Sequence, residues 1–198
     1  MIARLKLLAD KFCYSGGAFG SDLLFDQLGC ELGYKTVIWS FRGHNRNETK
    51  NSIIKELTQK ELNEKYDIIA SVRKTLNRRQ SSSQYIENLM LRNVFQITGV
   101  RKQTDLVIAI GRIKNSIVEG GTGYAVEVAK IFNKPIIVVD KINCQIYLYS
   151  YDSNQFEKID INYAKSLYKQ AKIFTGIGSR EIDCDALKPV LRSIMGGE

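Results

Sequence analysis

Residues 117–130 (IVEGGTGYAVEVAK) join a glycine-rich turn to a helix pattern, and they lie between two short apolar runs. The runs are residues 105–110 (DLVIAI) upstream and residues 135–140 (PIIVVD) downstream. Unbroken apolar runs of this length are typical of parallel strands that are covered on both faces. The order of strand, glycine turn, helix and strand therefore predicts an α/β fold with a mainly parallel sheet and helices on both faces.

The glycines of this turn, at positions 120, 121 and 123, leave backbone N–H groups uncovered at the start of a helix. Together with the positive end of the helix dipole, such groups favour an anion, commonly a phosphate. A plain tight turn explains one glycine-rich stretch equally well, because glycine is the usual residue wherever φ is positive. Recurrence of this strand, glycine turn and helix arrangement is what favours a phosphate site.

The arrangement of strand, glycine turn and helix occurs three times. Residues 16–22 (GGAFGSD) lie between a predicted strand at 12–15 and a helix at 23–33, and residues 176–180 (GIGSR) lie between a strand at 172–175 and a helix at 183–195. The remaining pattern predicts a strand at 35–39, mostly helix over 48–76, a helix at 85–95, a small β-hairpin from 145–150 and 156–159, and the later part of an amphipathic helix at 1–11.

The length and composition limit the number of domains, the cellular location and the kinds of ligand that we expect. A length of 198 residues predicts one domain over 1–198, and no apolar run is long enough to span a bilayer or to act as a signal peptide, so we expect a cytoplasmic protein. The four cysteines show no metal-ligand spacing and are expected to be free thiols. No metal and no cofactor are expected. The net charge of +8 fits an anionic ligand, nucleic acid or solubility alone.

The only histidine, His44, follows the predicted strand at 35–39 in a polar stretch. A phosphate contact is one interpretation, because open α/β sheets place ligands beyond the carboxyl ends of their strands. A solvated side chain is the preferred interpretation, since no nucleophile and acid partner can be argued around it.

The three glycine turns resemble motifs of the SLOG superfamily, a Rossmann-like group that contains LOG phosphoribohydrolases, DprA proteins and molybdenum-carrier proteins. Residues 15–22 (SGGAFGSD) are similar to its SGGAxGAD turn, and residues 120–123 (GGTG) with Glu127 are similar to its GGxGTxxE turn. Residues 174–180 (FTGIGSR) resemble its GIGSR segment, and residues 92–99 (RNVFQITG) resemble the RNxxQxxG segment of phage and bacterial members.

The order of these motifs differs from the usual one, because the GIGSR segment lies near the C-terminus instead of the N-terminus. Joining the two ends of the chain restores the usual order. The resemblance therefore implies a circularly permuted, Rossmann-like domain in which the strand at 172–175 lies beside the strand at 12–15. Chain termini that lie close together make such a rearrangement tolerable.

The resemblance implies that the three turns meet at the carboxyl edge of one sheet and bind a nucleotide-derived ligand with two phosphates. Arg180 would pair with a phosphate, Asp22 would meet ribose hydroxyls, and Trp39 or Phe41 would stack on a base unless each is core packing. The implied ligand-binding residues are Ser15, Gly16, Gly17, Phe19, Gly20, Ser21, Asp22, Trp39, Arg42, Asn93, Gly120, Gly121, Thr122, Gly123, Gly176, Gly178, Ser179 and Arg180.

Three functions follow from the resemblance, in order of preference. The first is a binding protein for an ADP-ribose derivative or cyclic nucleotide signal, either a phage-encoded sponge in the host cytoplasm or a sensor. The second is a LOG-type N-glycosidase for nucleoside monophosphates, with Glu127 as the catalytic residue and Arg92 assisting; Tyr124 stands where that family has Thr. The third is binding of single-stranded DNA, which dispersed basic residues support weakly. Relatives imply a homo-oligomer.

Overall fold

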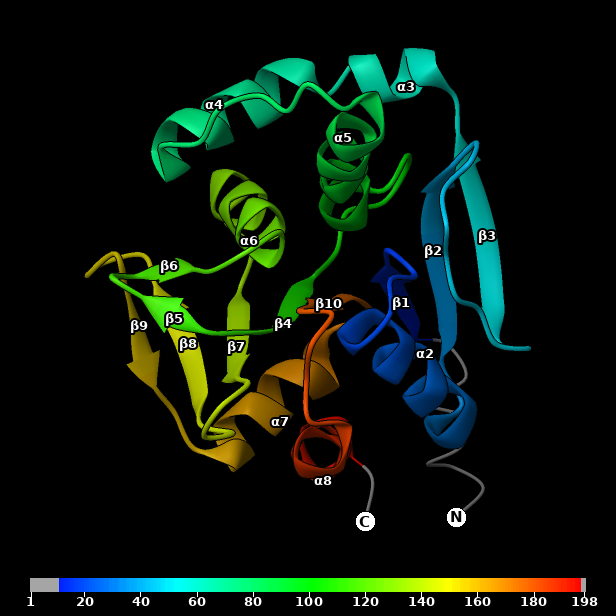
Figure 1. Cartoon of the computed structure of the whole chain (residues 1–198). Helices are drawn as coiled ribbons and strands as arrows, with labels where there is room; N and C mark the ends of the chain where they lie inside the picture. The colour runs from blue at the N-terminus through cyan, green and yellow to red at the C-terminus, as the bar shows by residue number, and fades with distance from the viewer. Residues whose placement is uncertain (1–10, 197–198) are drawn as a thin grey trace.

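Eight strands form one sheet in the order β3-β2-β1-β10-β4-β7-β8-β9. Figure 1 shows this computed structural model, in which residues 11–196 are described. The predicted helix at 1–11 lies outside the described residues except for Lys11. The strands are β1 (Phe12–Ser15), β2 (Lys35–Phe41), β3 (Ser52–Leu57), β4 (Leu106–Gly111), β7 (Ile136–Asp140), β8 (Ile146–Ser150), β9 (Gln155–Lys158) and β10 (Ile173–Gly178).

The six strands from β3 to β7 in this order are parallel, whereas β8 and β9 add an antiparallel hairpin to the β7 side. The α/β class, the mainly parallel sheet and the hairpin expected from the sequence are thus confirmed. A separate two-stranded ribbon, β5 (Ile113–Lys114) with β6 (Ile117–Val118), precedes the glycine turn at Gly120.

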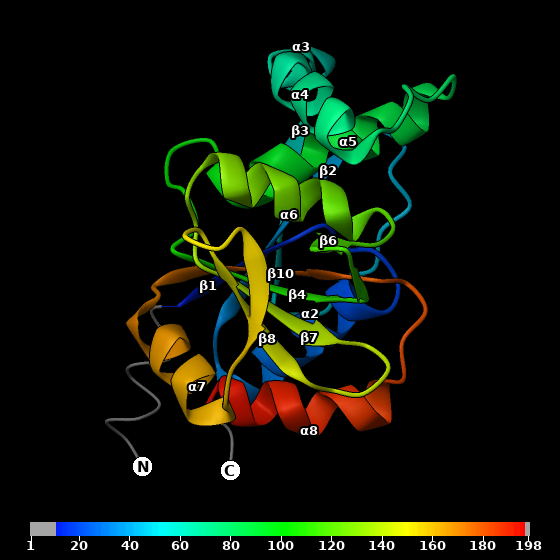
Figure 2. The same cartoon turned by 90° about the vertical axis from the view of Figure 1, so that its left-hand side faces the viewer.

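Helices cover both faces of the sheet (Figures 1 and 2). One layer holds α2 (Ser21–Leu32), α7 (Ile161–Gln170) and α8 (Cys184–Ile194); the other holds α3 (Gln59–Asn63), α4 (Tyr66–Leu76), α5 (Gln84–Thr98) and α6 (Thr122–Ile131). The alternation of strand side chains matches these layers. Along β4, Val107 and Ala109 join the core under α5 and α6, while Ile108 and Ile110 join the core under α2 and α8.

The last strand lies beside the first strand, as the motif order implied. β1 pairs with β10 in parallel, with Phe12 opposite Ile173 and Tyr14 opposite Thr175. On its other side β10 pairs with β4, so the C-terminal part of the chain supplies a central strand. This pairing brings the ends of β1, β10 and β4 to one edge.

Two local predictions differ from the structure, and one helix was not predicted. The segment 48–76 holds the edge strand β3 before its helices, because residues 52–57 pair with β2 over their full length and this pairing decides their structure. Residues 161–170 form α7, whose start is capped by the Asp160 carboxylate. Gly176 and Gly178 belong to β10 and not to a turn. Helix α8 begins at Cys184 with Asp183 as its cap and continues through Pro189.

A buried ion pair joins α4 to α5. Arg73 and Glu87 are both more than nine-tenths buried, and their side chains are in direct contact. Glu87 also accepts a hydrogen bond of 2.8 Å from the backbone N–H of Ser81, which holds the loop between the two helices.

We predict that Glu87→Gln lowers the free energy of unfolding by about 3 kcal/mol, because it leaves the Arg73 charge buried without a counter-charge. Urea unfolding measures this loss. The matched control is Glu64→Gln, at an exposed residue with no ion pair in the described chain, where the change is expected to stay within about 0.5 kcal/mol. Equal effects of the two substitutions would contradict the prediction.

Candidate functional site

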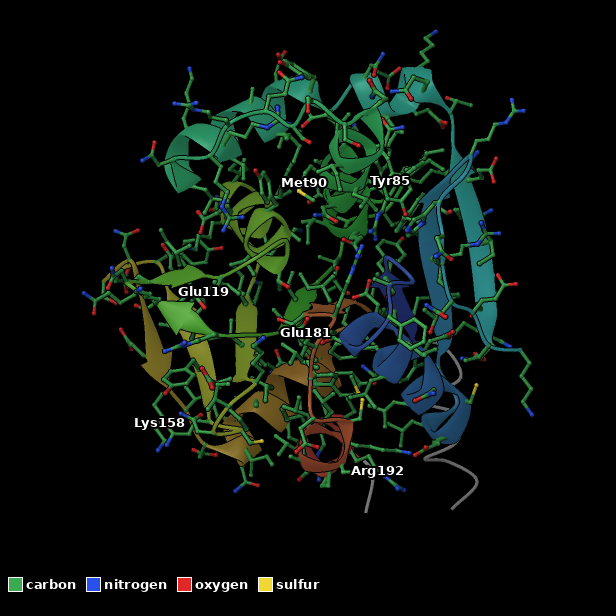
Figure 3. The ribbon with its side chains drawn as sticks, in the orientation of Figure 1. Tyr85, Met90, Glu119, Lys158, Glu181 and Arg192 are labelled. Carbon is green, nitrogen blue, oxygen red and sulfur yellow. The ribbon has the colours of Figure 1, made fainter. Side chains whose placement is uncertain are left out.

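A cavity of about 400 Å³ opens at the carboxyl edge of the sheet, between α5, α6 and the segment that follows β10. In Figure 3, Met90 lies on the side of α5 that faces α6, and Glu181 lies below the two helices. The lining includes Asp22 of α2, Arg92, Asn93 and Gln96 of α5, the turn from Gly120 to Thr122, Lys141 after β7, and residues 177–181.

Arg92 is the buried cation of this cavity. Its side chain projects from α5 and the residue is 4% exposed. Within the described chain it has no ion-pair partner, and its Nε has no hydrogen-bond acceptor. Burial lowers its pKa, yet a guanidinium remains charged in proteins. No carboxylate of the described chain lies within ion-pair distance of this guanidinium. The buried carboxylate that acts on it electrostatically, Asp22, is itself held by backbone N–H groups, so the arrangement leaves room for a further anion close to Arg92.

Gly16 makes room for this guanidinium. A Cβ added at Gly16 would lie 1.4 Å from Nη1 of Arg92, so any larger residue would displace the arginine. Gln96 contacts the same guanidinium of Arg92. With its amide oriented to satisfy both ends, Gln96 accepts from Nη1 of Arg92 at 3.2 Å and from the Gly16 N–H at 2.6 Å, and it donates to Asn93 Oδ1 at 2.9 Å.

The first glycine turn directs its backbone donors to a carboxylate of the protein. The Asp22 side chain accepts from the Ala18 N–H at 3.2 Å, and the N–H groups of Gly178 and Gly16 also act on it. Burial raises the pKa of Asp22, although Arg92 and these N–H groups oppose the rise. The turn at residues 16–20 therefore holds its own anion, which differs from the expectation that all three turns offer donors to a ligand.

The end of β10 is tied to the start of α2. The Ser179 carbonyl accepts from both the Ser21 N–H at 3.1 Å and the Ser21 hydroxyl at 2.8 Å, and the Ser179 N–H donates to the Ile110 carbonyl at 3.0 Å. A Cβ at Gly20 would lie 2.1 Å from the Arg180 carbonyl oxygen. The glycine there allows two backbone segments to touch and directs the Arg180 side chain toward the cavity mouth.

The turn before α6 is the one that presents its helix start to the cavity. Gly121 and Thr122 line the cavity, and the first N–H groups of a helix have no intrahelical acceptor. Arg78 braces this turn from the loop after α4: its Nη1 donates to the Gly120 carbonyl at 2.7 Å, and its guanidinium lies 5.1 Å from the Tyr124 ring. The positive end of α6 thus lies on the same cavity as Arg92.

The structure places the sequence-predicted residues in two groups. Those that line the cavity are Asp22, Arg92, Asn93, Gly120, Gly121, Thr122, Gly178, Ser179 and Arg180. Those that do not line it are Ser15, Gly16, Gly17, Phe19, Gly20, Ser21, Trp39, Arg42, Gly123, Glu127 and Gly176. Several glycines of the second group do not reach the cavity but allow the elements around it to pack closely. A Cβ at Gly176 would meet the Phe25 ring of α2, and one at Gly123 would meet the Val118 carbonyl.

The predicted aromatic contact to a base is not at this cavity. Trp39 is 5% exposed and packs in the core, with its ring centroid 5.5 Å from Tyr14 and 5.8 Å from Phe95. Arg42 lines a separate hollow beside Gln59 and Asn88. Phe19 is 67% exposed. The apolar wall of the cavity comes instead from α5.

Glu127 faces away from the cavity. Its Oε1 lies 2.7 Å from Nζ of Lys130, in an ionic contact whose angles do not fit a hydrogen bond. Lys130 in turn lies 4.3 Å from the Tyr149 ring centroid, on the β8 side of α6. A carboxylate neutralised in this way and turned from the cavity is not placed to act on a ligand there.

Sequence reasoning missed several lining residues, among them Ile86, Leu89, Met90, Gln96, Lys141 and Glu181. One signal was available in α5, because Asn88, Arg92 and Gln96 recur every four residues on a helix whose other face is apolar. A buried polar stripe at helical spacing indicates a helix that lines a polar site. Lys141 could have been found from its position directly after a strand that ends at the carboxyl edge.

His44 is buried, which corrects the preferred expectation of a solvated side chain. It is 6% exposed, stacks on Phe41 with ring centroids 4.9 Å apart, and places Nδ1 3.2 Å from the Ser40 hydroxyl. Burial, followed by the charges of Arg92, Arg46 and Arg180, lowers the pKa of His44 from 6.5 to about 3. Its neighbourhood is therefore strongly positive.

Comparisons with known proteins add little to this geometry. No protein-family model matches the chain, and no curated protein matches it. Among solved structures, the chain is similar to the "Putative molybdenum carrier protein" from Syntrophus aciditrophicus SB, with 15% identity, a TM-score of 0.48, and coverage of 93% of this chain and 90% of that one. A likeness of this degree carries no information on the ligand of the present chain.

Two further findings concern the described residues, 11–196. None of their helices is both long and apolar enough to cross a membrane. Within the same range, no group of three or more His, Cys, Asp or Glu side chains is placed to hold a metal ion.

Because the chain has a single histidine, its protonation can be followed directly by NMR. We predict that the His44 ring signals of the folded protein do not titrate between pH 7.5 and about 4.5, since the folded pKa is about 3. The unfolded chain in urea, which should titrate near 6.5, is the control.

Between pH 6.5 and 3 the unfolded chain binds a proton at His44 and the folded protein does not. The free energy of unfolding therefore falls as pH decreases through this range, by up to about 1.4 kcal/mol per pH unit from this group. A folded midpoint above about 5.5 would contradict the prediction.

Proposed function

We propose that this protein binds a phosphate-bearing, nucleotide-derived small molecule in the carboxyl-edge cavity and holds it without turnover. The observation that carries the proposal is Arg92, a guanidinium more than nine-tenths buried that lines a cavity and has no carboxylate within ion-pair distance in the described chain, although the charge of Asp22 acts on it. A phosphate oxygen pair matches the forked donors of a guanidinium, and such charge-assisted bonds are the strong ones.

The surrounding donors suit two phosphate groups. The first turn of α6 and Arg92 line the cavity together, while Arg180 and Lys141 stand at its mouth. A volume of about 400 Å³ lies within the range of small-ligand sites, roughly 300–1,000 Å³.

The remaining lining suits the other parts of a nucleotide. Ile86, Leu89 and Met90 of α5 form an apolar wall on which a base can pack, in place of the expected Trp39. Asn93, whose Oδ1 accepts from Gln96, has an amide NH₂ to donate, and Glu181 can accept from ribose hydroxyls. ADP-ribose derivatives and cyclic nucleotides carry these three chemical parts.

The arrangement of Glu127 favours binding over hydrolysis. The LOG-type N-glycosidase alternative assigns catalysis to Glu127, which is paired with Lys130 and does not line the cavity. Arg92, its supposed companion, lines the cavity without it. Single-stranded DNA ranks third, because its aromatic candidates, Trp39 and Phe41, are more than nine-tenths buried and offer little ring area on which successive bases could stack.

We further propose that the chain is a circularly permuted member of the SLOG superfamily; the parallel pairing of β1 with β10 is the adjacency that this requires. A protein that retains a nucleotide immune signal without consuming it acts as a sensor or as a sponge. A phage-encoded sponge would lower the free concentration of that signal in the host cytoplasm. The phage origin and the homo-oligomer remain predictions from the resemblance.

The first test is calorimetric titration with adenosine, AMP, ADP-ribose and a cyclic ADP-ribose isomer. We expect the phosphorylated compounds to bind and adenosine to bind weakly or not at all. Arg92→Gln is expected to weaken binding by about 2 kcal/mol, roughly 30-fold, because a charged hydrogen-bond donor is lost. The ligand-free Tm of the variant is expected to stay close to that of the wild type, because removal of a buried charge offsets the loss of its attraction to Asp22.

Arg192→Gln is the matched control for this test. Arg192 lies on α8, far from the cavity (Figure 3), and makes only a surface contact of 3.6 Å with Glu31. Binding by this variant should equal that of the wild type. Absence of binding to all the phosphorylated compounds, or equal binding by Arg92→Gln, would overturn the proposal.

Retention without turnover is tested separately by mass spectrometry. Purified protein is incubated with lysate from cells that produce nucleotide immune signals, washed, and heated to release bound molecules. We expect an intact phosphorylated nucleotide derivative from the wild type and a smaller amount from Arg92→Gln. Free base with ribose phosphate, lost on Glu127→Ala, would instead establish the N-glycosidase alternative.

A further inference from the structure

A second, larger hollow lies on the α5 face of the sheet, toward the amino ends of β1 and β10. Its volume is about 990 Å³, and its floor is made by Tyr14, Val37 and Trp39. The loop that follows α5 forms one wall, and β3 lies on the other side, because Lys55 stands beside Trp39 in the parallel register of β2 and β3. The carboxyl-edge cavity shares none of these lining residues.

The rim of this hollow is positively charged. Lys55, Arg101, Lys102 and Lys172 all line it, all are exposed, and none has an ion-pair partner in the described chain. The one carboxylate in the lining, Asp105, accepts the backbone N–H groups of Lys172 and Ile173 at 2.9 Å each. This carboxylate keeps its negative charge, so the four cations and one carboxylate of the lining give a net charge of +3.

Apolar groups remain uncovered between these cations. Val100 is 61% exposed and Phe12 is 36% exposed, and both line the hollow. An aromatic and aliphatic floor with a few converging charges is the composition of a small-molecule site, and exposed apolar surface of this kind marks a binding region. Four unpaired cations select the charge of the ligand.

We propose that this hollow is a second binding site, for an organic anion with an aromatic or branched apolar body and an acidic group. The apolar body lies on the floor formed by Tyr14 and Trp39, and the acidic group meets the cations of the rim. The site is independent of the carboxyl-edge cavity and of the function proposed for it.

The probe for this site is 8-anilinonaphthalene-1-sulfonate, which combines aromatic rings with one fixed negative charge. Trp39 is the only tryptophan of the chain and lies in the floor, so its emission reports binding directly. We expect saturable binding of one probe molecule per chain, with a fall in Trp39 emission. N-phenyl-1-naphthylamine, which has a similar aromatic body without the sulfonate, is expected to bind roughly tenfold more weakly if charge contributes as surface ion pairs do.

Charge reversal at the rim provides the specific variant. Lys55→Glu combined with Lys102→Glu is expected to weaken probe binding about tenfold or more, and both residues are exposed, so the fold should be kept. The matched control reverses two exposed lysines elsewhere, Lys114→Glu combined with Lys158→Glu. Lys158 lies on β9, at the opposite end of the sheet from β3 (Figure 3). The control should retain wild-type affinity.

Three outcomes would overturn the proposal. In the first, both double variants bind the probe alike. In the second, Arg92→Gln removes binding and the rim variant does not, which would place the probe in the carboxyl-edge cavity. In the third, sedimentation velocity shows self-association that Val100→Glu abolishes, which would make this surface a contact between two copies of the chain.

Discussion

The parallel pairing of β10 with β1 and β4 is the constraint on which the rest of the structure depends. It places the last strand of the chain in the middle of the sheet, with Ile177 and Gly178 beside Ala109 and Ile110 of β4. Because β10 ends there, Ser179 and Arg180 emerge between α2 and the start of α6. Without this pairing the carboxyl edge would lack one wall of its cavity, and the glycine contacts that close α2 onto β10 would have no partner.

Two arginines illustrate how this fold treats buried charge. Arg73 and Arg92 are both more than nine-tenths buried, and both contact α5 or project from it. Arg73 meets Glu87, so its charge is compensated within the protein. Arg92 meets only amide groups and the backbone of Gly16, while the nearest acidic group that acts on it, Asp22, is bound by backbone N–H groups. The buried charge is therefore compensated inside the protein in one case, and in the other it is the basis of the anion site that we propose.

The two ends of the parallel strands are built for different tasks. At the carboxyl edge, glycines allow backbone segments to touch, and the first residues of helix α6 line the cavity with the positive end of the helix. Toward the amino edge, α5 ends at Thr98 and leaves part of β1, β2 and β3 without a covering helix. The first arrangement is the basis of the phosphate site that we propose, and the second is the basis of the proposed site for an apolar anion.

The sequence by itself determined the class of the fold and the strands 12–15, 105–110 and 135–140 to within a residue or two. These features are local periodicities, which are properties of the chain alone. The adjacency of β1 and β10 followed from the resemblance of the motif order to that of a known family. Thr122 and Arg180, expected to bind a ligand, and Arg92, considered only as a catalytic residue, line the cavity. Only the tertiary structure decided which polar groups are free. Asp22 accepts N–H groups of the first glycine turn, and Lys130 neutralises Glu127. Trp39 packs against Tyr14 and Phe95, away from the carboxyl-edge cavity. Strand β3 likewise exists because β2 offers it a paired edge. A residue type fixes what a side chain can do, whereas the partners that reach it in space decide whether it remains available to a ligand.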